Sequence, residues 1–236
     1  MATRDYQTPL MEGQKTLEIC ELFYSIAGES SFSGAPALFV RLSGCNLRCE
    51  WCDTKKSWEK GKNISLEKLM DILTSRKTRL VVITGGEPLL QPDVVDLCNM
   101  LIEEGKTVQV ETNGSFDISV LPDGVQVVMD IKPPSSGEME KMDFENLSRL
   151  RPGDDLKIVI GSREDFRWAE KFIEEHGLSG VNQVFLSPAS GRIQDKELAE
   201  WMLDSCLDAR LQLQLHRILW NGESDGRIIE PWDYNS

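Results

Sequence analysis

Three cysteines lie close together near residue 50 and could act jointly as soft metal ligands. Cys45, Cys49 and Cys52 have the spacing C-x3-C-x2-C in the stretch GCNLRCEWCDT, and no fourth cysteine or histidine follows nearby. Thiolate sulfur binds both zinc and the irons of iron–sulfur clusters. The motif therefore raises the question of which metal centre needs three sulfur ligands and stops short of four.

Four kinds of cysteine site compete for this motif. A structural zinc site takes four protein ligands, usually from two separate knuckles, and the second knuckle is missing here. Three cysteines alone would be an unusual set for catalytic zinc, and a redox C-x-x-C pair would leave Cys45 without a role. A 4Fe–4S cluster held by three thiolates keeps one iron open for a substrate or cofactor. The chemistry favours this cluster, with zinc as the second choice.

Two neighbouring features bear on the cysteine motif. It directly follows the apolar run 37–42, and Trp51 could shield a cluster from water or simply pack in the core. Farther along, Gly85 and Gly86 follow a second apolar run in VVITGGEPLLQ. Glycines there let the backbone approach a ligand, although the loop lacks the lysine of a P-loop and the spacing of a dinucleotide site.

The elements that must position these loops follow from the apolar periodicity. Strands are expected at 17–24, 37–42, 80–84, 107–112, 125–131, 156–160, 183–187 and 210–216. Helices are expected at 64–75, 91–105, 162–177 and 195–206, with Ser65 and Ser162 as N-caps. Repeated strand–helix–strand units predict an α/β fold with a parallel sheet, whose ligands collect at the carboxyl ends of the strands. Segment 132–145 is the longest break and is expected to be a functional loop.

The composition excludes several classes of function. The chain of 236 residues carries 26 Lys and Arg against 39 Asp and Glu, a net charge of −13. This balance argues against binding to nucleic acid or to an anionic membrane, and it favours a small-molecule role. No apolar run approaches the roughly 20 residues of a membrane span, and the N-terminus has no signal-peptide core. We therefore expect a cytoplasmic protein with reduced thiols.

The remaining cysteines and one of the two histidines are expected to be structural. Cys20, Cys98 and Cys206 lie in apolar patterns and are predicted to be buried small hydrophobic residues. His176 precedes Gly177 at the end of a predicted helix, where it favours the helix dipole. His216 is predicted to end the last strand, so that it could reach a site at the edge of the sheet.

Taken together, the cysteine motif and the following strand–GGEP segment resemble the radical S-adenosylmethionine (SAM) superfamily. The resemblance implies that Cys45, Cys49 and Cys52 hold a 4Fe–4S cluster whose fourth iron chelates the methionine part of SAM. It implies that Gly85, Gly86 and Glu87 cradle that methionine end. Cleavage of SAM would then give a 5′-deoxyadenosyl radical that abstracts hydrogen from a substrate.

A closer resemblance covers residues 17–220 and includes GCNLRCEWCDT, TGGEP, ETNG, DIKPPSSG, LSPASG and LQLQLHRILW in order. These segments look like the 7-carboxy-7-deazaguanine synthase family of queuosine precursor biosynthesis. The resemblance implies a single domain over 1–236, with flexible ends at 1–16 and 221–236, and a partial (β/α)6-type barrel reduced in helices. It implies conversion of 6-carboxy-5,6,7,8-tetrahydropterin to 7-carboxy-7-deazaguanine with loss of ammonia. It further implies Mg²⁺, a homodimer and a reductant such as flavodoxin.

The same resemblance assigns roles to individual residues. Thr54 matches a threonine that ligates Mg²⁺, and Arg41 matches the arginine that binds the pterin carboxylate. The other residues implied to contact substrate are Ile26, Ala27, Gly28, Glu29, Thr84 and His216. The other residues implied to contact SAM are Lys132, Ser135, Ser136, Ser187 and Ser190.

The chain departs from the family pattern near its N-terminus. The family reads S-x-Q-G-E-G, whereas this chain reads SIAGES, with Ala27 in place of glutamine and Ser30 in place of the second glycine. The departures leave open a diverged homologue acting on another heterocycle. A glycyl-radical activating enzyme shares the cysteine spacing, but Arg41 suits a small anionic substrate better. A zinc-binding interaction domain is the non-enzyme alternative, and it would leave GGEP and ETNG without a role.

Overall fold

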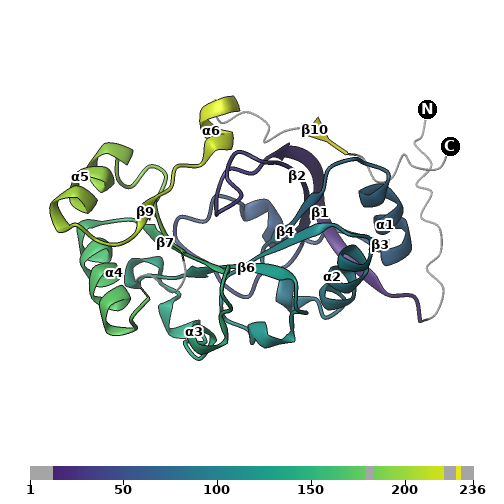
Figure 1. Cartoon of the computed structure of the whole chain (residues 1–236), viewed down its shortest axis with the longest axis horizontal. Coiled ribbons are helices and arrows are strands. Elements are labelled where there is room, and N and C mark those ends of the chain that lie inside the picture. The colour runs from purple at the N-terminus through teal and green to yellow at the C-terminus, as the bar shows by residue number, and fades with distance from the viewer. Residues whose placement is uncertain (1–12, 179–182, 221–226, 230–236) are drawn as a thin grey trace.

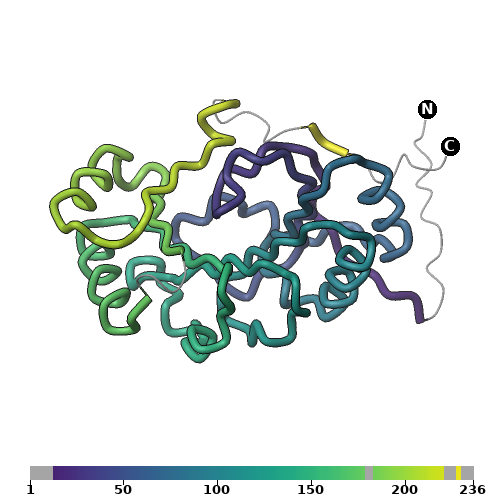
Figure 2. The backbone as a smooth tube through the Cα atoms, in the orientation of Figure 1, coloured from purple at the N-terminus to yellow at the C-terminus, as the bar shows by residue number. Residues whose placement is uncertain are grey.

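The protein is described here by a computed structural model that covers residues 13–178, 183–220 and 227–229. One curved sheet organises the chain, and helices α1 to α5 lie along the outside of the curve (Figure 1). The tube view shows the strands following one another around this curve from β1 to β9 (Figure 2). This arrangement confirms the α/β class and the partial barrel reduced in helices.

The sheet has ten strands within the described residues, in the order β10-β1-β2-β4-β5-β6-β7-β8-β9 with β3 paired to β1. The parallel part runs from β2 to β9, as strand–helix–strand spacing predicts. These strands are β2 (Pro36–Leu42), β4 (Leu80–Gly85), β5 (Thr107–Thr112), β6 (Val125–Ile131), β7 (Asp155–Ile160), β8 (Gln183–Pro188) and β9 (Arg210–Leu211). Their buried apolar side chains form most of the core.

The first strand is an exception to the parallel arrangement. β1 (Thr16–Ile26) pairs antiparallel with β2, because the connection of nine residues between them holds no helix to carry the chain across the sheet. β3 (Lys62–Ser65) and β10 (Arg227–Ile228) also pair antiparallel with β1. The end 221–236 therefore supplies a strand at residues 227–228, and most of its other residues, like most of 1–16, lie outside the described part.

Helices connect only some of the parallel strands. They are α1 (Leu66–Thr74), α2 (Val94–Glu103), α3 (Asn146–Arg149), α4 (Arg163–Glu175), α5 (Asp195–Ser205) and α6 (Leu215–Trp220). Five short 3₁₀ turns occur at Lys55–Trp58, Pro88–Leu90, Ile118–Val120, Pro134–Ser136 and Met139–Lys141. In the described chain the β5–β6 connection has only such a turn, and the β6–β7 connection has the four-residue α3, so the barrel is reduced in helices on this side.

Local sequence signals explain where the longer helices begin. The hydroxyl of Ser65 accepts a hydrogen bond from the Lys68 N–H, and that of Ser162 accepts one from the Asp165 N–H. Both N-caps confirm the predictions. His176 is the C-cap of α4, where its ring packs 4.4 Å from that of Phe172, which agrees with a structural role.

The predicted strand at 210–216 is wrong beyond Leu211. The Gln212 N–H still donates to the Leu186 carbonyl on β8. Beyond it the chain leaves the sheet, where the Gly28 carbonyl accepts from the Leu215 N–H and the Gln214 carbonyl accepts from the Arg217 N–H. The last two contacts start α6, so His216 lies in a helix and not at the end of a strand. The alternating leucines in this segment are typical of a strand. The alternation does not show, however, where the chain stops pairing with a neighbouring strand.

The scattered cysteines only partly follow the prediction. Cys98 on α2 is fully buried, Cys20 on β1 is half-buried, and Cys206 is exposed. Cys206 is the C-cap of α5 and adopts a left-handed conformation with φ of 53°, which turns it out of the helix. The expectation of burial is therefore wrong for Cys206, because its apolar neighbours belong to a helix end.

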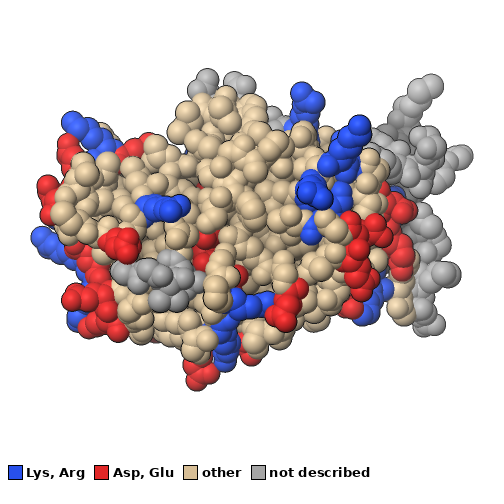
Figure 3. Space-filling view, in the orientation of Figure 1, with Lys and Arg blue, Asp and Glu red and all other residues tan. Residues whose placement is uncertain are grey.

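Charged side chains are distributed around the molecule in agreement with the acidic composition. On the face shown in Figure 3, acidic and basic groups alternate near the periphery, and uncharged residues occupy much of the middle. Within the described residues, no helix combines the length and apolarity that a membrane crossing requires.

Candidate active site

A cavity of about 860 Å³ lies at the carboxyl ends of the parallel strands. The loop after β2 contributes the cysteines, the end of β4 contributes Gly85, and the end of β5 contributes Thr112. Lys132 directly follows β6, and Ser187 lies near the end of β8. The strand-end rule therefore locates the site correctly.

The cysteine loop, defined here as residues 44–54, directs all three predicted thiols into this cavity. Cys45 Sγ accepts hydrogen bonds from the Leu47 N–H at 3.4 Å and from Asn113 Nδ2 at 3.9 Å. Cys52 N–H donates to the Cys49 carbonyl at 3.2 Å and tightens the turn between them. Burial raises the pKa of the Cys49 thiol to about 11, so a metal centre must displace its proton.

Three thiolates match the ligand set of a 4Fe–4S cluster that keeps one iron open. The thiolates of a cubane bind separate irons and therefore do not converge on one point. N–H···S contacts such as those to Cys45 are a known means of tuning cluster sulfurs. Trp51 also lines the cavity, consistent with shielding of this end from water.

The two glycines at the end of β4 are required by close packing, Gly85 against the end of β2 and Gly86 against the cysteine loop. A Cβ on Gly85 would lie 2.3 Å from the Leu42 carbonyl oxygen, and one on Gly86 would lie 2.0 Å from that of Gly44. Gly85 also has φ of 150°, which other residues rarely adopt. Both glycines line the cavity. A close backbone approach was predicted here for a ligand, and the glycines first of all let neighbouring segments of the chain pack together.

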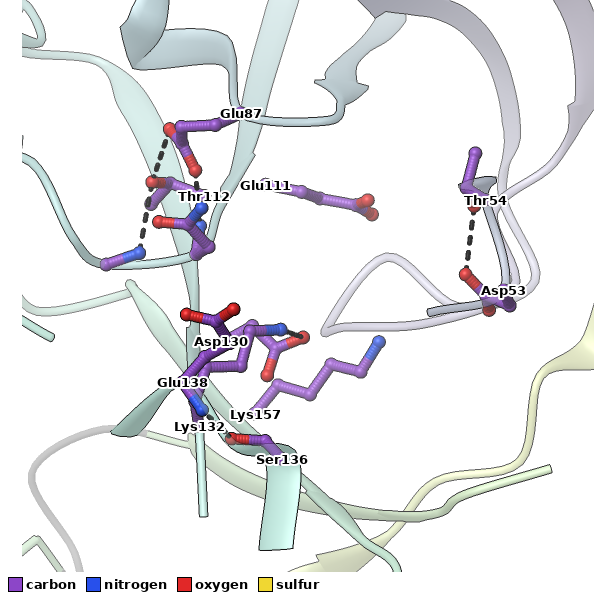
Figure 4. A network of polar contacts seen from close by, with 12 residues as sticks. Asp53, Thr54, Glu87, Glu111, Thr112, Asp130, Lys132, Ser136, Glu138 and Lys157 are labelled. Carbon is purple, nitrogen blue, oxygen red and sulfur yellow. Dashed lines mark hydrogen bonds and ion pairs between the residues drawn. The ribbon is translucent and has the colours of Figure 1, made fainter. Parts of the chain in front are cut away.

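Glu87 does not line the cavity, and its contact with SAM stays a prediction. Its side chain is fully buried, and it accepts hydrogen bonds from the Leu89 N–H, the Asn113 N–H and the Thr112 hydroxyl (Figure 4). These bonds tie the GGEP loop to the end of β5. Burial raises the pKa of this carboxyl, and the three donors oppose the shift.

The other residues implied to contact SAM divide into two groups. Lys132, Ser187 and Ser190 line the cavity, and the buried hydroxyl of Ser187 has no hydrogen-bond partner within the described chain. Ser135 and Ser136 do not line it: the Ser135 hydroxyl donates to Asp165, and Ser136 accepts from the Glu138 N–H. Both serines therefore hold the loop after β6 in shape.

Arg41 lies near the end of β2 and points into the cavity, as expected. Its Nε lies 3.1 Å from a carboxylate oxygen of Glu21, which also accepts from Lys56 Nζ at 2.9 Å. The Arg41 side chain is only 12% exposed, and its guanidinium lies over the Phe23 ring. The pair with Glu21 uses Nε, which leaves the terminal nitrogens to face an anionic ligand.

Thr54 reaches the cavity from the end of the cysteine loop. Its hydroxyl donates to Asp53 at 2.9 Å, and Asp53 accepts from Gln214 Nε2 and Arg217 at 3.2 Å each. Burial alone would raise the pKa of Asp53, but the Lys157 charge and the bonds from Gln214 and Thr54 lower it to about 2. Thr54 and Asp53 thus present hard oxygen atoms of the kind that Mg²⁺ prefers.

His216 reaches the cavity from α6, although its predicted strand is absent. A Cβ on Gly28 would lie 2.2 Å from His216 Nδ1, so glycine at that position makes room for the imidazole. The remaining residues of the N-terminal motif, Ile26, Ala27 and Glu29, line the cavity beside them. The site therefore joins segments separated by most of the chain.

Comparisons with known proteins agree with this geometry. Residues 39–130 match the family model described as the radical SAM superfamily. The 7-carboxy-7-deazaguanine synthase of Chlorobaculum tepidum is 39% identical over 92% of this chain and 100% of its own length. The synthase of Methanospirillum hungatei is 40% identical over 86% of this chain and 85% of its own length. The chain belongs to the 7-carboxy-7-deazaguanine synthase family.

A solved structure from this family has a similar fold. QueE from Escherichia coli aligns with a TM-score of 0.70 and 25% identity, over 86% of this chain and 95% of that one. Family membership confirms the radical SAM assignment, and with it the 4Fe–4S cluster and SAM as cofactors. Family membership therefore excludes the zinc-binding interaction domain, which was the alternative without enzymatic activity.

The structure shows how the chain accommodates its two departures from the family pattern, Ala27 and Ser30. Ser30 has φ of 67°, a left-handed conformation that glycine adopts more easily. The Ser30 hydroxyl accepts from Gln109 Nε2 at 2.8 Å and from the Phe32 N–H, so the side chain anchors the turn. Ala27 N–H donates to the Ala35 carbonyl at 2.8 Å, a bond that needs no side chain.

Sequence reasoning missed a group of charged residues that we call the charged wall: Glu29, Glu111, Asp130, Lys132 and Lys157. Glu29 and Lys132 were assigned by resemblance, but their partners were not. Lys157 Nζ lies 2.7 and 2.8 Å from the two oxygens of Glu29, and Lys132 Nζ lies 2.9 Å from Asp130. The available signal was a charged residue inside an otherwise apolar strand, as in LKIVI and VQVVMDI.

Proposed function

We propose that this protein converts 6-carboxy-5,6,7,8-tetrahydropterin to 7-carboxy-7-deazaguanine with loss of ammonia. One observation carries the proposal: a single cavity contains three cysteine thiols and, on its wall, the guanidinium of Arg41. The thiols suit a cluster with SAM, and the guanidinium suits the carboxylate that substrate and product both retain. The named relatives act as synthases of this deazapurine, which supports the same substrate here.

The residues of the chain divide the work of this reaction. Cys45, Cys49 and Cys52 would hold the 4Fe–4S cluster, where reductive cleavage of SAM supplies a radical that takes hydrogen from the substrate. Arg41 orients the substrate by its carboxylate. The charged wall faces the heterocycle with paired donors and acceptors.

Magnesium belongs to the same proposal. Thr54 would bind Mg²⁺ through its hydroxyl, with substrate oxygens and water completing the coordination. Asp53 supports this role, because its low pKa keeps a negative charge beside the hydroxyl. Thr54→Ala should weaken the Mg²⁺ dependence of turnover, and an unchanged Mg²⁺ titration would remove Thr54 from the site.

The remaining proposals concern the cellular setting. We propose that the enzyme works in the cytoplasm as a homodimer and receives electrons from a reductant such as flavodoxin. Light scattering of the purified protein measures the oligomeric state, and a mass equal to one chain would contradict the dimer. Replacing a chemical reductant by reduced flavodoxin in the assay tests the electron donor.

The deciding experiment is an anaerobic assay. The reconstituted protein is mixed with SAM, a reductant, Mg²⁺ and 6-carboxytetrahydropterin, and products are identified by mass spectrometry. Formation of 7-carboxy-7-deazaguanine together with 5′-deoxyadenosine supports the proposal. Formation of 5′-deoxyadenosine alone would mean that a diverged substrate, another heterocycle or a peptide, replaces the pterin.

A further inference from the structure

The carboxylates that line the cavity differ in their ion pairs. Five Asp or Glu side chains line it within the described residues, and four of them have a cationic partner within 4 Å. The four pairs are Glu21 with Arg41, Glu29 with Lys157, Asp53 with Arg217, and Asp130 with Lys132. Glu111 is the carboxylate without such a partner in the described chain.

Glu111 extends from the end of β5 into the space between the sheet and the Asp53–Thr54 segment (Figure 4). Its Oε2 accepts a hydrogen bond from the Thr84 hydroxyl on β4 at 2.8 Å. The ammonium of Lys157 on β7, whose charge acts on Glu111, is already bound to both oxygens of Glu29. The Oε1 atom of Glu111 is therefore free to face a ligand in the cavity.

Burial is the main factor that favours the neutral form of Glu111. Burial and the negative charge of Glu29, in the turn after β1, raise the pKa of this carboxyl. Lys157, the Thr84 hydroxyl and Arg41 on β2 act in the opposite direction without reversing the shift. At the end of β6, Asp130 and the following residue but one, Lys132, form an ion pair of their own. Because Glu111 is also the cavity carboxyl without an ion pair in the described chain, its neutral form is favoured, and Oε1 is the oxygen left to hold the proton.

We propose that Glu111 is a catalytic residue: it holds a proton in the resting enzyme and delivers it to the ring nitrogen that leaves as ammonia. The assignment rests on the proposed function, because it needs a substrate that expels an amine. A general acid is suited to this proton transfer when its pKa lies near the operating pH and a free oxygen points toward the substrate.

The carboxyl group of Glu111 is enough to balance the protons in the release of ammonia. Glu111 transfers its proton to the lone pair of the amine that is still attached to the contracted ring by one C–N bond. That bond breaks, its electron pair leaves with nitrogen as ammonia, and the neighbouring ring nitrogen stabilises the cation that remains. The Glu111 carboxylate then accepts the proton from the adjacent C–H bond, whose electrons form the ring double bond. The acid is regenerated, and no oxidant or reductant is consumed.

Other cavity groups are less suited to this role. Burial lowers the pKa of the Lys157 ammonium, but the carboxylates of Glu29 and Asp130 raise it above its ordinary value. Lys157 thus retains its proton and holds Glu29 in the charged form. His216 lines the same cavity from α6 and packs directly on Gly28. Glu111 alone combines a free oxygen with a carboxyl that has no ion pair in the described chain.

The first test is the Glu111→Gln variant in the anaerobic assay. It keeps the size of the side chain and its acceptor for Thr84 but removes the transferable proton. Release of ammonia and deazapurine should fall about 100-fold or more, the usual range for a general acid, while 5′-deoxyadenosine still forms. Wild-type turnover should also decline as Glu111 deprotonates at high pH, and the residual activity of the variant should lack that decline. The exposed Glu103→Gln on α2 is the matched control.

A second measurement reads the proton directly and needs no turnover. The infrared difference between the wild-type holoprotein and Glu111→Gln at neutral pH should contain the carbonyl stretch of a protonated carboxylic acid. A spectrum without that band overturns the proposal. A band that disappears instead in Glu29→Gln places the proton on the other carboxyl and also overturns it.

These outcomes separate the two levels of inference. If the wild-type protein makes 5′-deoxyadenosine but no deazapurine, the proposed substrate is wrong, and the assignment of ammonia as the leaving group fails with it. The infrared band would still decide whether Glu111 stores a proton. Normal deazapurine production by Glu111→Gln would leave the proposed function intact and overturn the role of Glu111.

Discussion

The cysteine loop and the charged wall line one cavity but are assembled in opposite ways. The three thiols come from one stretch between Cys45 and Cys52, and local hydrogen bonds shape it. The wall joins residues as far apart as Glu29 and Lys157, which are separated by 128 positions. Asp130 and Lys157 are paired in the register of β6 and β7, as Arg41 and Thr84 are in that of β2 and β4. The first region depends on spacing, whereas the second depends on strand register.

The largest effect is expected from Cys49→Ala. The variant leaves two thiols and no spare ligand nearby, so it should lose the cluster and all formation of 5′-deoxyadenosine. Its folding should change little, because the removed thiol belongs to a loop. Iron content, absorbance of the anaerobic protein and 5′-deoxyadenosine release measure the loss. Cys206→Ala, at an exposed helix end, is the control and should behave as wild type. Retained SAM cleavage in Cys49→Ala would refute the cluster ligands.

Lys157→Met should have the opposite effect to Cys49→Ala, because it should lower the stability of the folded protein. It removes a cation that is 13% exposed and leaves Glu29 without a partner, a change that costs about 3 kcal/mol for a largely buried pair. The pKa of Lys157 is raised in the folded state, so its contribution is fully present below its ordinary pKa of 10.5 and is lost only at higher pH. Urea unfolding at pH 7 and pH 9 should therefore give the same difference. Lys171→Met on the exposed side of α4 is the control, and an equal loss there would contradict this account.

Arg41→Ala should affect substrate binding and leave both regions intact. Loss of a charge-assisted contact to a carboxylate raises the apparent KM for the pterin about tenfold to a hundredfold. Uncoupled cleavage of SAM should continue, because the cysteine loop is unchanged. The measurement is deazapurine formation against pterin concentration, with Arg79→Ala at the opposite end of the sheet as control. An unaltered KM would mean that the carboxylate binds elsewhere.

The smallest effect is expected from Ser30→Gly. Glycine relieves the left-handed backbone at Ser30, a gain of about 1 kcal/mol, but it removes the hydroxyl that binds Gln109 and makes the unfolded chain more flexible. These contributions nearly cancel, so the free energy of unfolding should change by less than about 1 kcal/mol. Thermal unfolding measures the difference. A clear gain in stability would show that the hydroxyl contributes little to the turn.

Most of the fold could be predicted from sequence, because its signals are local. Apolar runs marked β2 and β4 to β8, and serines marked the starts of α1 and α4. The prediction failed where a long-range contact intervenes, as at residues 212–216, where Gly28 accepts a hydrogen bond from Leu215 and helps α6 to begin. The antiparallel pairing of β1 with β2 was likewise not predicted, and it follows from a connection that holds no helix.

The sequence by itself determined the chemistry of the cysteine loop, because three ligands at fixed spacing need only a turn to bring them together. It also determined the family, through motifs that keep their order along the chain. Only the tertiary structure decided that Glu87 joins two loops, that His216 arrives on a helix, and that Lys157 neutralises Glu29. The physical reason is that the charge state of a buried group depends on its neighbours in space, and sheet register, which no short motif records, chooses those neighbours.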